Sequence, residues 1–277
     1  MKIFAIGDLH LGHAVDKPMD VFGARWKDHA SRIAGNWEKA VGPDDLVLVP
    51  GDLSWAMRME EAEEDLKWLE RLPGRKIIIK GNHDYWWPSI SRLRRRLEGT
   101  SVHALQYDSI AVGPVAVGGT RLWTFPDLSC YRDPLAETPY GGPPDETRCR
   151  GAPAEMPAES SGSSRPGAGA VVPEAARDQD EKIFARELGR LESSLRSMDP
   201  ACRVRIAMTH FPPTGETGSE TPVTKLLESC QIRLCAFGHL HSLDLPRGTW
   251  DFNLRGVRYV LASCDAINFR PCFLMEV

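Results

Sequence analysis

Histidine, aspartate and asparagine residues gather at five points of the 277-residue sequence, each just after a short apolar run. Aspartate and histidine are common metal ligands, and the amide oxygen of asparagine can join them. At two of the five points the polar residues stand two positions apart, so both side chains of an extended segment lie on one side. A carboxylate, imidazole and amide set without thiolate suits manganese, iron, cobalt or zinc. The residues are Asp8 and His10, Asp52, Asn82 and His83, His210, and His239 and His241.

The apolar runs before these residues predict buried strands. Each run has four or five residues, and four of the five are closed by a glycine, at positions 7, 51, 81 and 238, that we expect to permit a tight turn. Apolar residues at helical spacing predict helices over Trp26–Val41 and Met59–Leu72. Alternating strands and helices imply a parallel sheet, and ligands bind at the carboxyl edge of such a sheet. The runs are Lys2–Ile6, Leu46–Val49, Lys76–Ile79, Val204–Met208 and Leu234–Phe237.

Shorter apolar segments predict further strands. Ile110–Val112 and Val115–Val117 flank a Gly-Pro pair and are typical of an antiparallel hairpin. The segments Val257–Ala262 and Phe273–Val277 indicate two more strands near the end of the sequence. The predicted fold class is therefore α/β.

One segment has a different composition. Glu137–Asp180 holds 7 of the 21 prolines and 6 of the 24 glycines but no Leu, Ile, Phe or Trp. Such a stretch cannot bury enough apolar surface to offset its ordering entropy. We expect residues 137–180 to be a disordered or loosely packed insertion in a single domain that spans 1–277, followed by a helix from Glu181 to Met198.

Composition and charge exclude several classes of protein. The net charge is -4, which argues against a stable nucleic-acid partner. Apolar runs are too short for a membrane-spanning helix. The first residues turn polar after four apolar positions, which favours a strand over a secretory signal. Seven cysteines without a CxxC pair indicate reduced thiols, and we expect a cytoplasmic location.

The five motifs, in this order, resemble the calcineurin-like metallophosphoesterases. The resemblance covers most of the chain and is closest to a group of small bacterial predicted phosphohydrolases. It implies two packed mixed β-sheets with helices on both outer faces, a four-layer sandwich. The motifs are D-x-H at Asp8–His10, G-D at Gly51-Asp52, G-N-H-D at Gly81–Asp84, the single His210, and G-H-x-H at Gly238–His241.

The resemblance also implies a role for each of these residues. Asp52 would bridge two divalent transition-metal ions, with manganese expected first and iron, zinc or cobalt as alternatives. A water between the ions would be the nucleophile, and His83 would donate a proton to the leaving oxygen. The first ion would be held by Asp8, His10 and His241. The second would be held by Asn82, His210 and His239.

The sequence departs from the Ser/Thr protein phosphatases of this superfamily after Asp52. Trp55 stands where those enzymes carry an acid, and Ala56 stands where they carry an arginine. The acid normally orients the proton-donating histidine, and Asp84 is its nearest replacement in the sequence. These departures argue against a protein phosphatase.

Three residues near the motifs are candidate substrate contacts. His13 could contact a substrate phosphate, or it could be an exposed loop residue. Trp55 and Trp86 could stack against a nucleotide base, or they could pack the loops that carry the ligands.

The predicted function is hydrolysis of a small phosphate mono- or diester by a two-metal centre. Within the enzymes, the alternative is a nuclease or cyclic-nucleotide phosphodiesterase. From another class, the alternative is a catalytically silent binding scaffold on the same fold, which would be expected to have lost ligands.

Overall fold

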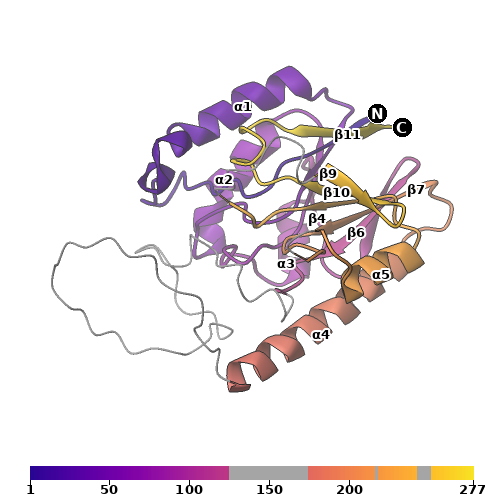
Figure 1. Ribbon diagram of the computed structural model, residues 1–277. Helices are drawn as coiled ribbons and strands as arrows, with labels where there is room; N and C mark the ends of the chain where they lie inside the picture. Colours follow the sequence, from indigo (N-terminus) through magenta and orange to yellow (C-terminus); the bar gives the residue numbers. More distant parts are fainter. Residues whose placement is uncertain (125–173, 216–217, 242–250) are drawn as a thin grey trace.

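A computed structural model describes residues 1–124, 174–215, 218–241 and 251–277, and within them the strands form two mixed sheets (Figure 1). The first sheet has the strand order β11-β1-β2-β3-β4. Strands β1 to β4 are parallel to one another, and β11 pairs with β1 in the antiparallel direction. Its strands are β1 (Lys2–Ala5), β2 (Leu46–Val49), β3 (Arg75–Ile78), β4 (Val102–Ala104) and β11 (Cys272–Glu276).

The second sheet has the order β5-β6-β7-β8-β10-β9. Its four inner strands are parallel, while β5 and β9 form antiparallel edges. The predicted hairpin is therefore confirmed as β5 and β6. The strands are β5 (Ser109–Val112), β6 (Val115–Thr120), β7 (Val204–Thr209), β8 (Leu234–Phe237), β9 (Asp251–Leu254) and β10 (Val257–Leu261).

Five helices cover the outer faces of the two sheets in the part of the chain that the structure describes (Figure 1). The first three lie on the first sheet and the other two on the second. They are α1 (His29–Ala40), α2 (Met59–Arg71), α3 (Ile90–Arg96), α4 (Glu174–Arg196) and α5 (Pro222–Ser229). The predicted four-layer α/β sandwich is confirmed.

Two predicted helix boundaries are wrong. The helix expected to begin at Trp26 begins at His29, because Asp28 adopts a left-handed backbone (φ 53°) and the residues before it form a separate 3₁₀ turn, Ala24–Trp26. Helix α4 begins at Glu174, inside the segment expected to be disordered. Alanine, glutamate and arginine have high helix propensity, so the local sequence favours a helix here although it lacks large apolar residues. The rest of the predicted insertion, residues 137–173, lies outside the described residues.

The core has three layers because both faces of each sheet are buried. In β1, Ile3 and Ala5 point into the space between the sheets, whereas Phe4 points toward the helices on the first sheet. The second sheet repeats this alternation, with Ile206 facing the first sheet and Ala207 facing α4 and α5. Burial on both faces explains why the strands read as continuous apolar runs.

No helix of the described residues is long and apolar enough to cross a membrane. Five cysteines in this part of the chain are free thiols: Cys202, Cys230, Cys235, Cys264 and Cys272.

Candidate metal centre

The seven predicted metal ligands come together where five parallel strands end. Strands β1, β2 and β3 deliver ligands from the first sheet, and β7 and β8 deliver them from the second. Six of the seven side chains are buried and Asn82 is half-buried. The centre therefore lies at the seam between the two sheets.

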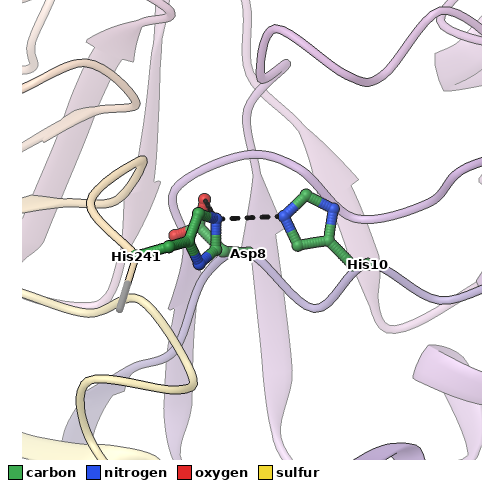
Figure 2. Close-up of side chains that lie close together, drawn as sticks. All are labelled: Asp8, His10 and His241. Atoms are coloured by element: carbon green, nitrogen blue, oxygen red, sulfur yellow. Dashed lines mark hydrogen bonds and ion pairs between the residues drawn. The ribbon is translucent and has the colours of Figure 1, made fainter. Parts of the chain in front are cut away.

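The first group of ligands is shown in Figure 2. The Nε2 atoms of His10 and His241 lie 3.1 Å apart, and His241 Nε2 lies 3.7 Å from Asp8 Oδ1. Each of the three side chains places one donor atom within 4.8 Å of the others. Atoms at this spacing can coordinate one cation between them.

The second group lies around the amide of Asn82. Its Oδ1 is 2.5 Å from His210 Nε2 and 3.0 Å from His239 Nδ1. An amide oxygen and two imidazole nitrogens thus converge, which agrees with the ligand set that the resemblance implies for the second ion.

Asp52 lies between the two groups. Its Oδ2 is 3.8 Å from His10 Nε2 and 3.5 Å from His210 Nε2. This oxygen is buried and has no hydrogen-bond partner among the described residues. A buried carboxylate oxygen without a donor is costly, and a cation on either side would supply the missing interaction. The residues present therefore fit a metal centre with a shared carboxylate.

Two further groups hold the imidazoles in orientation. His210 Nδ1 donates to the Pro50 carbonyl oxygen at 3.0 Å, and His241 Nδ1 donates to Asp265 Oδ1 at 3.0 Å. In a neutral ring this leaves Nε2 unprotonated and aimed into the centre, as a metal ligand requires. Asp265 was not predicted as part of the site. It follows β10, which is a sixth parallel strand ending at the same edge, and that position was the available signal.

Most of the left-handed backbone conformations at the metal centre belong to predicted ligands and not to the motif glycines. Four ligands themselves have left-handed backbones: Asp8 (φ 54°), His10 (φ 45°), Asp52 (φ 50°) and His239 (φ 74°). Of the four motif glycines, only Gly51 has a positive φ, at 94°. The other three glycines lie outside the left-handed region.

Close approach explains two of these glycines. A β-carbon at residue 81 would overlap the carboxylate and backbone of Asp52, and one at residue 238 would press on Asp8 Oδ2. Glycine at these positions leaves room for the carboxylates that the centre needs.

Burial shifts the pKa values of the ligands in opposite directions. It raises the pKa of Asp8 to about 7, partly offset by His241, and it raises that of Asp52 well above its usual range. Burial lowers the pKa values of His10 and His210 well below their usual range, and neighbouring histidines add to this effect. The imidazoles are thus held neutral, which is their ligating form, and a bound cation would favour ionised carboxylates.

The candidate proton donor lies beside the shared carboxylate. The backbone N–H of His83 donates to Asp52 Oδ1 at 2.8 Å, and its ring lies 4.7 Å from that of Trp55. Asp84, the residue next to His83, links the loops that carry the predicted ligands. Its carboxylate accepts bonds from the backbone N–H groups of Leu53, Ser54 and Gly81 and from Trp86 Nε1, so it ties two ligand loops together.

The three candidate substrate contacts have these surroundings. Trp55 is buried and its ring stacks on that of His10, with ring centres 4.8 Å apart. Trp86 is also buried, and its Nε1 donates to Asp84 Oδ1. Their burial favours packing of the ligand loops over base stacking. His13 is partly exposed, and its Nδ1 lies 2.6 Å from Asp65 Oδ1.

Comparison with known proteins identifies the family. The chain matches the model of the calcineurin-like phosphoesterases over residues 1–243, a range that contains all five motifs. The chain belongs to this family.

This phosphoesterase is also similar to two curated phage proteins, each called Gene 66 protein. It is 36% identical over 111 residues to that of Mycobacterium phage D29, covering 40% of this chain and 53% of the relative. It is 35% identical over 77 residues to that of Mycobacterium phage L5, covering 28% of this chain and 37% of the relative. The matches thus span about half of the first relative and just over a third of the second.

Two solved structures are similar to the phosphoesterase. Phosphopantetheinyl hydrolase (PptH) from Mycobacterium tuberculosis has a TM-score of 0.50 at 17% identity, covering 100% of this chain and 96% of that one. Protein AQ665 of unknown function from Aquifex aeolicus has a TM-score of 0.44 at 14% identity, covering 98% and 95%. The similarity to PptH concerns the fold.

The family match and the geometry agree on the kind of site. The chain belongs to the calcineurin-like phosphoesterases, and its clustered aspartates and histidines are groups that could bind metal.

Proposed function

We propose that this phosphoesterase hydrolyses small phosphate mono- or diesters with two metal ions that share Asp52. The position of Asp52 carries the proposal, because its Oδ2 lies between His10 and His210 and has no hydrogen-bond partner among the described residues. Asp8, His10 and His241 would hold one ion. Asn82, His210 and His239 would hold the other.

Manganese is the ion that we propose first, because oxygen and imidazole donors without thiolate suit it. Iron, zinc and cobalt suit the same donors. Two such ions, when bound, would activate a water and neutralise charge on the phosphate. A cytoplasmic location, predicted from the cysteine pattern, is part of this proposal.

The protein's own residues supply orientation and a proton. Pro50 and Asp265 fix the ring orientations of His210 and His241. His83 lies beside Asp52, where its imidazole could donate a proton to the leaving oxygen of an ester. Trp55 packs against both His83 and His10, so it restricts the motion of the donor and of a ligand together.

A substrate panel tests this proposal. The manganese-loaded protein would be assayed with aryl monoesters, aryl diesters, nucleotides, cyclic nucleotides and single-stranded DNA. We expect turnover of small esters that is abolished by a chelator and restored by manganese. Cleavage of DNA or cyclic nucleotides alone would favour the nuclease or phosphodiesterase alternative. Inactivity on the whole panel despite bound metal would favour the binding scaffold.

A further inference from the structure

A cavity of about 410 Å³ adjoins the candidate metal centre on the side of Asn82. Asn82 lies on its wall, and the Oδ1 of the same side chain contacts His210 and His239. The other walls come from the loop after β3, the loop between β4 and β5, the end of β6 and one face of α4. A molecule in this cavity would therefore lie beside the second ligand group.

The cavity is cationic although the protein as a whole is acidic. Its lining includes four cations against one carboxylate, Glu187, which leaves a local charge of +3 in a chain of net charge -4. Charge of one sign in a concave site concentrates ligands of the opposite sign. The four cations are Lys80, Arg121, Arg186 and Arg190.

Glu187 positions one of these cations, Arg190. Its buried carboxylate lies 2.5 Å from Arg190 Nη1 and accepts a hydrogen bond of 2.8 Å from Thr120 Oγ1. Arg190 in turn lies over the ring of Tyr107, at 4.3 Å from its centre. Arg186 is 3.8 Å from the same carboxylate and remains 52% exposed. Its guanidinium is thus held at the cavity with much of its surface open to a ligand.

Aromatic and amide groups complete the wall. Tyr107 has a left-handed backbone (φ 64°), which is rare for a bulky residue and is often found at functional sites. Trp87 Nε1 donates to Gln106 Oε1 at 3.0 Å, which fixes both side chains at the cavity. These groups form a rigid surface for the organic part of a ligand next to the cations.

We propose that this cavity binds a second phosphate on the organic group of the substrate, so that the enzyme prefers esters with two phosphates. Arginine is suited to this role because its planar fork binds phosphate oxygens in pairs. A local charge of +3 suits a phosphate dianion better than a singly charged carboxylate. This inference rests on the proposed function, since it extends the site of the same reaction.

Matched substrates test the proposal. Alkanediol bisphosphates of two to six carbons would be compared with hydroxyalkyl monophosphates of the same lengths, using the manganese-loaded protein and measuring released phosphate. We expect kcat/KM to favour the bisphosphate by about tenfold or more at the best length, mainly through KM, because charge-assisted contacts to the second phosphate strengthen substrate binding. The absence of a preference at every length would overturn the proposal.

Variants on α4 connect the preference to the cavity. Arg186→Gln and Arg190→Gln should each reduce the ratio of bisphosphate to monophosphate kcat/KM toward one. Arg196→Gln is the matched control, because Arg196 lies on the same helix, is 69% exposed and pairs with Glu192 outside the cavity. Its ratio should equal that of the wild type. Equal slowing of both substrates by Arg186→Gln would contradict the proposal, as would a preference that survives both cavity variants.

Two further outcomes separate this proposal from the proposed function. If the wild type hydrolyses neither these substrates nor any ester of the panel above, the proposed function fails. Calorimetry with the same bisphosphates then decides whether the cavity binds them. Binding that Arg186→Gln weakens about tenfold would support the cavity, and no binding would overturn it. The protein could instead cleave single-stranded DNA in a way that depends on Arg186 and show no bisphosphate preference. That result would mean that the cavity binds a polyanion and would overturn the proposal.

Discussion

At the scale of single residues, four of the predicted metal ligands have strained, left-handed backbones. Asp8, His10, Asp52 and His239 all have positive φ values. Each such residue costs on the order of 1–3 kcal/mol and persists only where the surrounding structure imposes it. Aspartate and histidine tolerate this region better than most residues, so the ligand types and their conformation are compatible. The strain turns each side chain inward from the end of its strand.

Gly81→Ala is expected to damage the centre because a β-carbon there overlaps Asp52. We predict loss of bound metal, a fall in turnover of at least about 100-fold, and a loss of about 1–3 kcal/mol in the free energy of unfolding. The control is Gly189→Ala on α4, where a β-carbon meets nothing within 4 Å. Metal analysis, ester hydrolysis and thermal unfolding of the two variants test this, and normal metal content in Gly81→Ala would contradict it.

His83→Ala tests the proton-donor role. A nitrophenolate leaves readily as an anion, whereas an alkoxide needs a proton, so we predict that alkyl phosphate hydrolysis falls about 100-fold more than p-nitrophenyl phosphate hydrolysis. Metal content should stay at the wild-type level. His103→Ala on β4, which lies outside the motifs, is the control and should change neither rate. Equal slowing of both ester types by His83→Ala would show that His83 only positions the phosphate.

At the scale of elements, a buried lysine joins α2 to β3. Lys76 is fully buried, and its ammonium donates to the carbonyl oxygens of Glu70 and Leu72 at the end of α2 and to Ser101 Oγ. These carbonyls would otherwise lack partners at the helix end. Burial lowers the pKa of Lys76 from 10.5 to about 8.

Lys76→Met should therefore destabilise the protein at pH 7 by about 1–3 kcal/mol, because buried carbonyl groups lose their donors. The effect should depend on pH. Between pH 8 and 10.5 the unfolded chain holds the lysine proton more strongly than the native one, so the wild type gains stability relative to Lys76→Met as the pH rises. The gain is at most about 3 kcal/mol. Urea unfolding of both proteins at pH 7 and pH 10 measures it, and a constant difference would contradict the lowered pKa.

The strands that precede the predicted ligands can be predicted from the sequence, whereas two short strands, β4 and β9, cannot. The five ligand strands are confirmed because apolar runs followed by polar residues mark buried strands that end at one edge. Strand β4 was not predicted, since its three residues include a histidine, and β9 was not predicted because its residues are partly exposed. Tertiary pairing creates both strands.

The convergence of the seven predicted ligands could be predicted from spacing and resemblance, whereas the groups that hold these side chains in place could not. Asp265 and the Pro50 carbonyl act on His241 and His210 through contacts far apart in the sequence. The contact between Trp55 and His83 likewise depends on how two loops pack. Such contacts become visible only once the sheets are placed against each other.

At the scale of the whole molecule, the centre joins the two sheets. Gly7 after β1 exchanges backbone hydrogen bonds with residues after β10, with Gly7 N–H donating to the Ala262 carbonyl at 2.7 Å and Cys264 N–H to the Gly7 carbonyl at 3.0 Å. The backbone N–H of His239 donates to both oxygens of Asp8. Bound metal would add contacts across the same seam, so metal binding should stabilise both sheets together.

Metal removal should therefore lower the thermal stability of the whole molecule. A metal ion present at 100 times its dissociation constant raises the free energy of unfolding by about 2.7 kcal/mol. We predict one cooperative unfolding transition whose midpoint rises by several degrees when manganese is added to chelator-treated protein. Calorimetry with and without manganese measures the shift, with magnesium as a comparison ion. An unchanged midpoint would mean that the native state gains no stability from the metal.

The metal content of the purified protein tests the central claim most directly. Reconstitution with manganese followed by elemental analysis should give about two equivalents per chain for the wild type and about one or fewer for Asp52→Asn, which removes the carboxylate shared by both ions. Asp251→Asn is the control, because Asp251 is 42% exposed and pairs with Arg258 away from the centre, and it should also give about two. A wild type that binds one equivalent or none, or an Asp52→Asn variant that keeps two, would contradict the two-metal centre.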